Sequence, residues 1–387
     1  MGKIRVLHCP AIVAGNAQHL ARAERELGIE SWAVALTESP FGYETDEILW
    51  DRKDNVIMHE IKRWRLLVRA LKDFDIIHFN FGQSITPEWL PPHPTFREKH
   101  HLLSLSIYNF YARMLELCDL LLLKKAGKGI VVTYQGDDAR QGDFCQANFE
   151  ISPATEVEPG YYSKKSDAHK RRKIAQFGKY ADRIYALNPD LLHVLPGRSQ
   201  FLPYSHIDLR DWEPINKANP NLKVPVIVHA PSHQGVKGTP FILKAISRLT
   251  SEGVALEFVQ VEGVSHSKAR QIYERAELLI DQLLCGWYGG LAVELMALGK
   301  PVICYIREGD LKFIPEQMRK DLPIINATPT TIYEVLKEWL TVRRDELPEI
   351  GRRSRAYVEK WHDPLKIAAR LKADYESILS SNRHSGY

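Results

Sequence analysis

The feature that most restricts the fold is an alternation of short, strand-like apolar runs with helical patterns along almost the whole chain. The first series begins at residues 4–9 (IRVLHC) and passes through a loop into a helix over 16–28. Alternation of this kind predicts an α/β protein, with parallel sheets covered by helices on both faces. The further strand candidates of this series are residues 31–36, 55–61, 75–81, 129–134, 183–187 and 200–204.

A second alternating series follows a polar stretch, residues 205–224, which we interpret as a linker because it holds Pro214 and Pro220. With 387 residues the chain is long enough for two domains. Ligands in such sheets bind beyond the carboxyl ends of the strands, so the cleft between the domains is the expected site. The second series comprises strands at 225–230, 255–261, 277–284 and 301–306, helices at 240–249 and 266–275, and a mainly helical part over 330–380.

The bulk composition excludes several classes of protein. A net charge of +4 is too small to indicate nucleic-acid binding. The five cysteines are scattered, which favours free thiols in a reducing compartment over a zinc site. The first ten residues lack the apolar core of a signal peptide, and no uncharged stretch reaches spanning length. We therefore expect a cytoplasmic protein.

A glycine-rich loop precedes a short apolar helix in "GWYGGLAVELMALGKPV", residues 286–302. Gly286, Gly289 and Gly290 allow a ligand to approach the backbone closely, and the start of the following helix suits an anion such as phosphate. Glu294 lies about one turn into that helix, and its two oxygens suit the paired hydroxyls of a ribose. The alternative is an ordinary helix with one acid near its N-terminus, which the helix dipole alone favours.

A second strand end repeats this pattern in "HAPSHQGVKGTPFILKAI", residues 229–246. Ser232, His233 and Lys237 are hydrogen-bond donors gathered where another helix begins. Lys237 is suited to neutralise a diphosphate as a point charge, although a solvated surface lysine is the commoner case. Two anion-suited loops at strand ends of one domain favour a phosphate-bearing ligand.

These stretches resemble the donor domain of retaining glycosyltransferases of the GT-B fold, glycosyltransferase family 4. The resemblance lies in KGT (237–239), the GWYGG loop and VELMALGKPVI (293–303), with weaker similarity in VTYQGDDAR (132–140) and ALNPDLLHVLP (186–196). It implies two Rossmann-like domains facing across a cleft, with C-terminal helices crossing back to the N-domain. The implied boundaries are 1–205 for the acceptor-side domain, 206–355 for the nucleotide-sugar domain and 356–387 for the returning helix.

The resemblance also implies roles for individual residues. Glu294 would bind the donor ribose and Lys237 the diphosphate, while the glycine loop, including Tyr288, would face the donor sugar and its phosphate. The family has a second glutamate where this chain has Gly286, and often an arginine where it has Ser232. The hypothetical replacements are Asp281 or Gln282 for the acid, and His233 or an N-domain arginine for the charge.

The N-terminal half contributes "TYQGDDAR", expected at a strand end facing the cleft. Asp138 would orient or deprotonate an acceptor hydroxyl, and Arg140 would pair with donor phosphate or with the neighbouring acid. The alternative is an acid-rich turn with a local Asp–Arg pair. Gly15 and Asn16, in the loop after the first strand, are candidates for lining the cleft.

The leading hypothesis is transfer of a sugar from a nucleotide-diphosphate donor to an unidentified acceptor hydroxyl, with retention of configuration and without a metal or other cofactor. A binding module without turnover and a nucleotide-sugar epimerase on the same fold are the alternatives. The apolar segment 102–123 and the basic run 164–173 leave two interpretations. In the first, both segments contact a membrane with anionic lipid. In the second, 102–123 is a buried helix and 164–173 is the solvated face of another helix. The second is favoured here.

Overall fold

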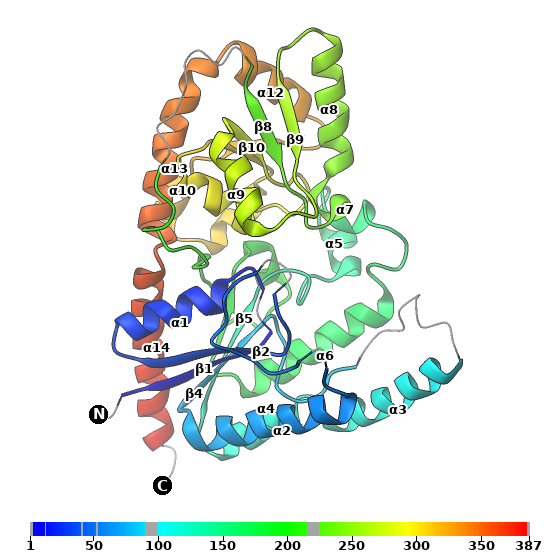
Figure 1. Cartoon of the computed structure of the whole chain (residues 1–387), viewed down its shortest axis with the longest axis vertical. Helices are drawn as coiled ribbons and strands as arrows, with labels where there is room; N and C mark the ends of the chain where they lie inside the picture. The colour runs from blue at the N-terminus through cyan, green and yellow to red at the C-terminus, as the bar shows by residue number, and fades with distance from the viewer. Residues whose placement is uncertain are drawn as a thin grey trace.

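Two parallel sheets, one in each half of the chain, form the framework of the molecule (Figure 1). The computed structural model describes residues 3–11, 13–39, 42–51, 53–89, 99–214 and 224–384. The first sheet has the strand order β3-β2-β1-β4-β5-β6-β7, and the second β12-β11-β10-β8-β9. The strands of the first sheet are β1 (Arg5–Pro10), β2 (Glu30–Ala35), β3 (Glu47–Ile48), β4 (Ile76–Asn80), β5 (Gly129–Tyr134), β6 (Arg183–Ala186) and β7 (Gln200–Phe201). Those of the second are β8 (Val226–His229), β9 (Glu257–Gln260), β10 (Leu278–Ile280), β11 (Val302–Cys304) and β12 (Ile325–Asn326).

Helices cover both faces of each sheet, as the alternating pattern predicted. In the first half they are α1 (Asn16–Glu26), α2 (Val56–Asp73), α3 (Lys99–Leu115), α4 (Cys118–Lys125), α5 (Gly142–Asn148) and α6 (Lys164–Tyr180). In the second half they are α7 (Gln234–Lys237), α8 (Thr239–Ser251), α9 (His266–Arg275), α10 (Gly290–Ala297), α11 (Glu316–Asp321), α12 (Ile332–Thr341), α13 (Leu347–Trp361) and α14 (Pro364–His384). Short 3-10 turns lie at Pro153–Thr155, Pro189–His193, Glu308–Phe313 and Arg344–Glu346.

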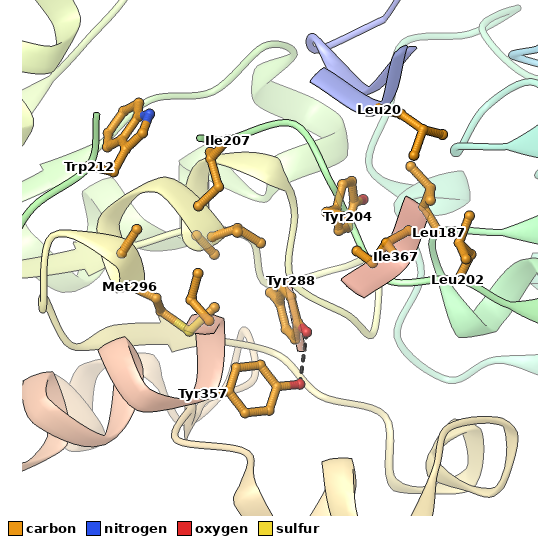
Figure 2. Close-up of a cluster of buried hydrophobic side chains, with 14 of the residues drawn as sticks. Leu20, Leu187, Leu202, Tyr204, Ile207, Trp212, Tyr288, Met296, Tyr357 and Ile367 are labelled. Atoms are coloured by element: carbon orange, nitrogen blue, oxygen red, sulfur yellow. Dashed lines mark hydrogen bonds between the residues drawn. The ribbon is translucent and has the colours of Figure 1, made fainter. Parts of the chain in front are cut away.

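Alternate side chains of the strands enter different cores because successive residues point to opposite faces of a sheet. Val6 packs in one cluster with α1 and α14, while Leu7 packs in another with α2, α4 and α6. In the second sheet Val228 joins the first of these clusters and Ile227 a third, under α8 and α12. One apolar cluster therefore continues from the first half into the second, through the connecting segment and α10 (Figure 2).

The chain crosses between its halves twice. The first crossing follows β7; its described part includes the buried residues 202–207 and Trp212, whereas residues 215–223 of the expected linker lie outside the described part. The second lies between α13 and α14, and α14 then packs beside α1 on the N-terminal sheet (Figure 1). Tyr375 of α14 donates its hydroxyl hydrogen to Glu24 of α1 at 2.9 Å.

Three sequence-based expectations about elements are wrong. Residues 55–61 were expected as a strand but begin α2, because the Asn55 side chain caps the helix by accepting from Met58 N–H at 2.9 Å. The segment 102–123 is two helices that break at Leu117, and Ile107 and Phe110 of its first helix are exposed instead of buried. The strand expected over 277–284 ends at Ile280.

Candidate functional site

The carboxyl end of β10 and helix α7 bring four predicted donor-site residues into one hydrogen-bonded group. Nζ of Lys237 donates to Gln282 Oε1 at 2.6 Å and to Asp281 Oδ1 at 3.3 Å. The second oxygen of the Asp281 carboxylate accepts from Gly289 N–H at 2.6 Å, at the N-cap of α10. Gln282 in turn donates to the carbonyl of Trp287. One ammonium group is thus held beside the start of α10 by a buried carboxylate.

Gly286, where the resembled family has its other glutamate, lies directly under the guanidinium of Arg307. Its φ is +79°, and a Cβ atom at this position would be 2.6 Å from Arg307 Nη1. The guanidinium is fixed by Asp310 at 2.8 Å and the carbonyl of Ile151 at 2.8 Å, and it stacks on the ring of Phe149. The structure therefore places a cation where the family's acid would be, and leaves no room for a side chain.

Replacing Gly286 with alanine is expected to lower the free energy of unfolding by ~2–4 kcal/mol, from the left-handed backbone and from the clash with Arg307. Gly253 provides the matched control, since its φ is +80° but a Cβ there meets nothing within 4 Å. Its alanine variant should lose only ~1–2 kcal/mol, the backbone cost alone. Urea denaturation of both variants checks this, and equal losses would contradict the packing argument.

Glu294 is buried in α10 and is surrounded by side chains from three other parts of the chain. The Tyr43 hydroxyl donates to Glu294 Oε1 at 3.3 Å, and Nε2 of His266 lies 3.3 Å from the same oxygen. Nε2 of His206 lies 3.6 Å from it. Tyr43 belongs to the first half, His206 to the first crossing and His266 to the start of α9. The acid thus meets groups that converge from both halves.

The ionisation of Glu294 is set by competing influences. Burial raises its pKa, but the adjacent His206 and His266 outweigh burial and bring the pKa to about 2. In return, the hydrogen bond that His266 donates to Glu294 raises the pKa of His266. The carboxylate is therefore ionised at neutral pH and offers strong acceptor oxygens.

A cavity of about 180 Å³ opens beside Glu294. His206 lines it and is only 2% exposed, yet neither of its ring nitrogens has a hydrogen-bond partner among the described residues. His206 pairs with Glu294 at 3.6 Å, which is longer than a hydrogen bond, and a buried imidazole without hydrogen bonds is costly unless a ligand or water satisfies it. The other lining residues are His19, Arg22, Gly42, Tyr43, Glu44, Asp211, Trp212, His266 and Arg270.

The predicted loop residues Gly15 and Asn16 are not among the residues that line this cavity, but both contact residues of its wall or their neighbours. A Cβ at Gly15, whose φ is +73°, would be 2.8 Å from the Tyr43 ring, so the glycine lets the ring pack against the start of α1. Asn16 Oδ1 accepts from Ser205 N–H at 3.1 Å, which ties the loop to the first crossing. Gly290 faces the cavity's histidine, because a Cβ there would be 3.2 Å from His206 Nε2.

The remaining predicted donor-side residues have separate surroundings. Ser232 is exposed. His233 Nδ1 accepts from Val236 N–H at 3.2 Å, which caps α7, so Nε2 carries the proton and lies 3.2 Å from Glu158 Oε1. The imidazole thereby joins α7 to the N-terminal half.

Tyr288 is completely buried in the shared apolar cluster (Figure 2). Its hydroxyl lies 2.8 Å from the hydroxyl of Tyr357 and 2.9 Å from Nε2 of His362. The side chain therefore belongs to the core instead of facing a ligand as expected, and it connects the loop to α13.

Asp138, the predicted acceptor-side acid, closes the turn after β5. Its carboxylate accepts from Gly136 N–H at 2.7 Å and from Gln135 N–H at 3.1 Å. Burial raises its pKa to about 6, although these amide donors act in the opposite direction. The group thus changes protonation near neutral pH, in the range useful for proton transfer.

Arg140 is held between two acids. Its Nη1 donates to Asp137 at 3.0 Å and its Nε to Asp190 at 2.9 Å. Asp137 also accepts from the hydroxyls of Tyr161 at 2.5 Å and Tyr162 at 2.6 Å. The structure therefore contains the local Asp–Arg pair that the sequence left as the alternative, extended into a buried network.

A second cavity, of about 350 Å³, lies at the carboxyl ends of β1, β2 and β4. Trp50, Tyr108, Arg63 and Glu88 contribute aromatic and charged groups to its lining. Arg63 is fixed by donating to the carbonyl of Ile85 at 2.9 Å. Aromatic faces and fixed charges of this kind are suited to a polar organic ligand.

Within the described part of the chain, one group of side chains has the spacing of a metal site: Glu88, Glu116 and His169. Lys173 pairs with Glu88, and Arg172 pairs with Glu116. Burial raises the pKa of Glu88, but Lys173 and His169 outweigh it and bring the pKa to about 2. Each carboxylate thus already has a cationic partner.

Sequence reasoning missed the residues that surround Glu294, namely Tyr43, His206 and His266, and it missed Arg307, which lies against Gly286. One signal was present for His266, since "EGVSHSK" is a polar loop between a strand and a helix start, like the loops that were recognised. Tyr43, His206 and Arg307 reach the site through tertiary packing, which no local pattern reveals.

No protein-family model and no curated protein matches the sequence. Solved structures are similar in fold. Sucrose-phosphate synthase from Thermosynechococcus elongatus gives a TM-score of 0.61 at 15% identity, covering 97% of this chain and 100% of that one. The catalytic domain of starch synthase IV from Arabidopsis thaliana, bound to ADP and acarbose, gives 0.58 at 12% identity, with 98% and 100% covered.

A putative UDP-N-acetylglucosamine 2-epimerase from Listeria monocytogenes gives a TM-score of 0.54 at 12% identity, covering 98% of each chain. At these identities the similarity shows the architecture. The chain has the GT-B fold, as the sequence predicted, with two Rossmann-like halves facing one another and a helix that returns to the first.

Proposed function

We propose that the protein is a glycosyltransferase that moves a sugar from a nucleoside-diphosphate donor to an acceptor hydroxyl with retention of configuration. The observation that carries the proposal is that α10 and its N-cap have two charged groups beside them: the ionised Glu294, which meets side chains from both halves, and the ammonium of Lys237, which the Asp281 carboxylate links to Gly289. A ribose needs acceptors for its hydroxyls, and a diphosphate needs positive charge.

In the proposed complex Glu294 accepts hydrogen bonds from the ribose, as it now accepts one from the Tyr43 hydroxyl. His206, which pairs with Glu294 at 3.6 Å but makes no hydrogen bond with a described residue, supplies a further donor or acceptor to the same ligand. Lys237 and the positive end of α10 stabilise the leaving diphosphate, so the reaction is proposed to need no metal ion. Asp138, with its pKa of about 6, is the proposed partner of the acceptor hydroxyl.

The second candidate is a nucleotide-sugar epimerase, because the fold is also that of the putative epimerase from Listeria monocytogenes. Both candidates share the donor site and differ only in the fate of the sugar. Conversion of the donor in the absence of any acceptor favours the epimerase, whereas transfer that depends on an acceptor favours the transferase.

The test is a panel of nucleoside-diphosphate sugars, screened by thermal shift and then by mass spectrometry of the products. A donor at 100 times its Kd is expected to stabilise the fold by about 2.7 kcal/mol. Turnover that persists in a chelator supports the metal-free reaction, and strict dependence on Mn²⁺ or Mg²⁺ contradicts it. Saturable binding without turnover over a broad acceptor panel leaves only the binding-module alternative.

A further inference from the structure

Exposed large apolar side chains gather on three helices of the N-terminal half. Of the seventeen such residues in the described part of the chain, ten lie on α2, α3 and α4. Scattered apolar residues are normal on a protein surface, but a concentration of this kind marks an interaction face. These ten residues are Val56, Ile57, Met58, Ile61, Val68, Ile107, Phe110, Met114, Leu121 and Leu122.

The apolar residues are aligned along the helices. On α2, Ile57, Ile61 and Val68 are spaced to share one side of the helix. On α3, residues 107, 110 and 114 do the same. The two helices are joined where Trp64 Nε1 donates to the Tyr111 hydroxyl at 2.9 Å, and they lie at the end of the molecule away from the second sheet (Figure 1).

The same side of the molecule is strongly basic. Helices α2, α3, α4 and α6 together contain sixteen Lys and Arg but only four Asp and Glu, whereas the whole chain carries a net charge of +4. Seven of these sixteen cations pair with acids among the described residues, as Lys62 does with Asp54. Arg65 and Lys72 are exposed, belong to the same side of α2 as Ile61, and form no ion pair with any described residue.

We propose that this face, made by the exposed apolar residues of α2, α3 and α4 and their unpaired cations, docks on the surface of an anionic phospholipid bilayer. The apolar side chains enter the boundary between headgroups and acyl chains, and the flanking Lys and Arg contact lipid phosphates. An uncharged protein surface would bind the apolar residues but would leave these cations without partners. The contact is peripheral: no described helix is long and apolar enough to cross a bilayer. Arg63 and Tyr108, which come from α2 and α3, also line the 350 Å³ cavity, so the docking helices contribute to its wall.

The test is flotation with vesicles of phosphatidylcholine, with and without phosphatidylglycerol. The full chain is expected to float only with the anionic vesicles and to be released by added salt. The triple variant Ile107→Ser/Phe110→Ser/Met114→Ser should lower the partition constant about tenfold or more, because it removes the large exposed apolar side chains of the described part of α3. Arg65→Gln/Lys72→Gln should lower it several-fold and reduce the salt dependence.

Val342→Ser is the control, because Val342 is an apolar residue of the second half that, at 81%, is more exposed than any of the three replaced on α3. It should float like the unchanged protein, and circular dichroism should show that all variants are folded. Absence of binding to anionic vesicles overturns the proposal. So does a concentration-dependent dimer, seen by sedimentation, that the triple variant abolishes, since the face would then be an interface between copies.

Discussion

Replacing Glu294 with glutamine is expected to weaken donor binding by about 10- to 100-fold, because a hydrogen bond to a charged acceptor contributes ~1.5–3 kcal/mol. Glutamine keeps the size of the side chain but removes the charge that faces Tyr43, His206 and His266. Calorimetric titration with the donor found in the panel measures the change. Glu334→Gln, an exposed acid in the first turn of α12, is the control and should bind normally.

A second readout separates loss of the charge from general damage to the site. The Glu294 hydrogen bond raises the pKa of His266, so the variant should lower that pKa, in the direction burial already favours. The pair stabilises the fold fully below the ordinary histidine pKa, and this contribution is lost as pH rises through the raised value. An NMR titration of the ring checks it, and an unchanged His266 pKa means that the carboxylate does not act through this bond.

Replacing Lys237 with methionine is expected to lower kcat/KM by about 100- to 1000-fold, since one preorganised group that stabilises developing charge is removed. The variant also leaves Asp281 buried without its cation, which costs stability. A double variant with Asp281→Asn removes the unpaired charge. We expect it to recover thermal stability but not activity, while Asp281→Asn alone remains active; this difference assigns the lysine to the diphosphate instead of to the fold.

The control for Lys237 is Lys244→Met, an exposed lysine on α8 in the same half. Inhibition by the nucleoside diphosphate gives an independent measure, because the proposed contact is with the phosphates. Recovery of activity together with stability in the double variant would mean that Lys237 serves only to neutralise Asp281.

Local pattern was enough to predict both sheets, the start of α10 at Gly290 and the end of α8 near Leu249, because buried parallel strands and glycine loops have distinct sequences. It failed at residues 55–61, whose β-branched and apolar residues resemble a strand. An exposed helix face normally carries polar residues, but at the start of α2 this face is apolar. The segment therefore lacks the helical alternation of polar and apolar residues and looks like a strand. The misassigned segment is therefore part of the proposed lipid-facing surface.

The candidate site was predictable only in part. Lys237, Asp281, Gln282 and Gly289 follow strand ends in sequence and do lie together. The pairing of Arg140 with both Asp137 and Asp190 could not be chosen from sequence, because Asp190 is fifty residues away in the chain. Local spacing fixes neighbours on one element, whereas the partners of a buried charge are fixed by tertiary packing.

The returning helix α14 has a consequence for how the protein is made. It packs buried residues such as Leu371 and Tyr375 against the N-terminal sheet, and the Tyr375 hydroxyl donates to Glu24 in the first helix. During synthesis the first half therefore leaves the ribosome with one face of its sheet covered by α1 but not yet by α14, which is translated only after the second half. The N-terminal domain is thus completed after the domain that follows it, and a chain truncated before Pro364 lacks this helix of its first domain.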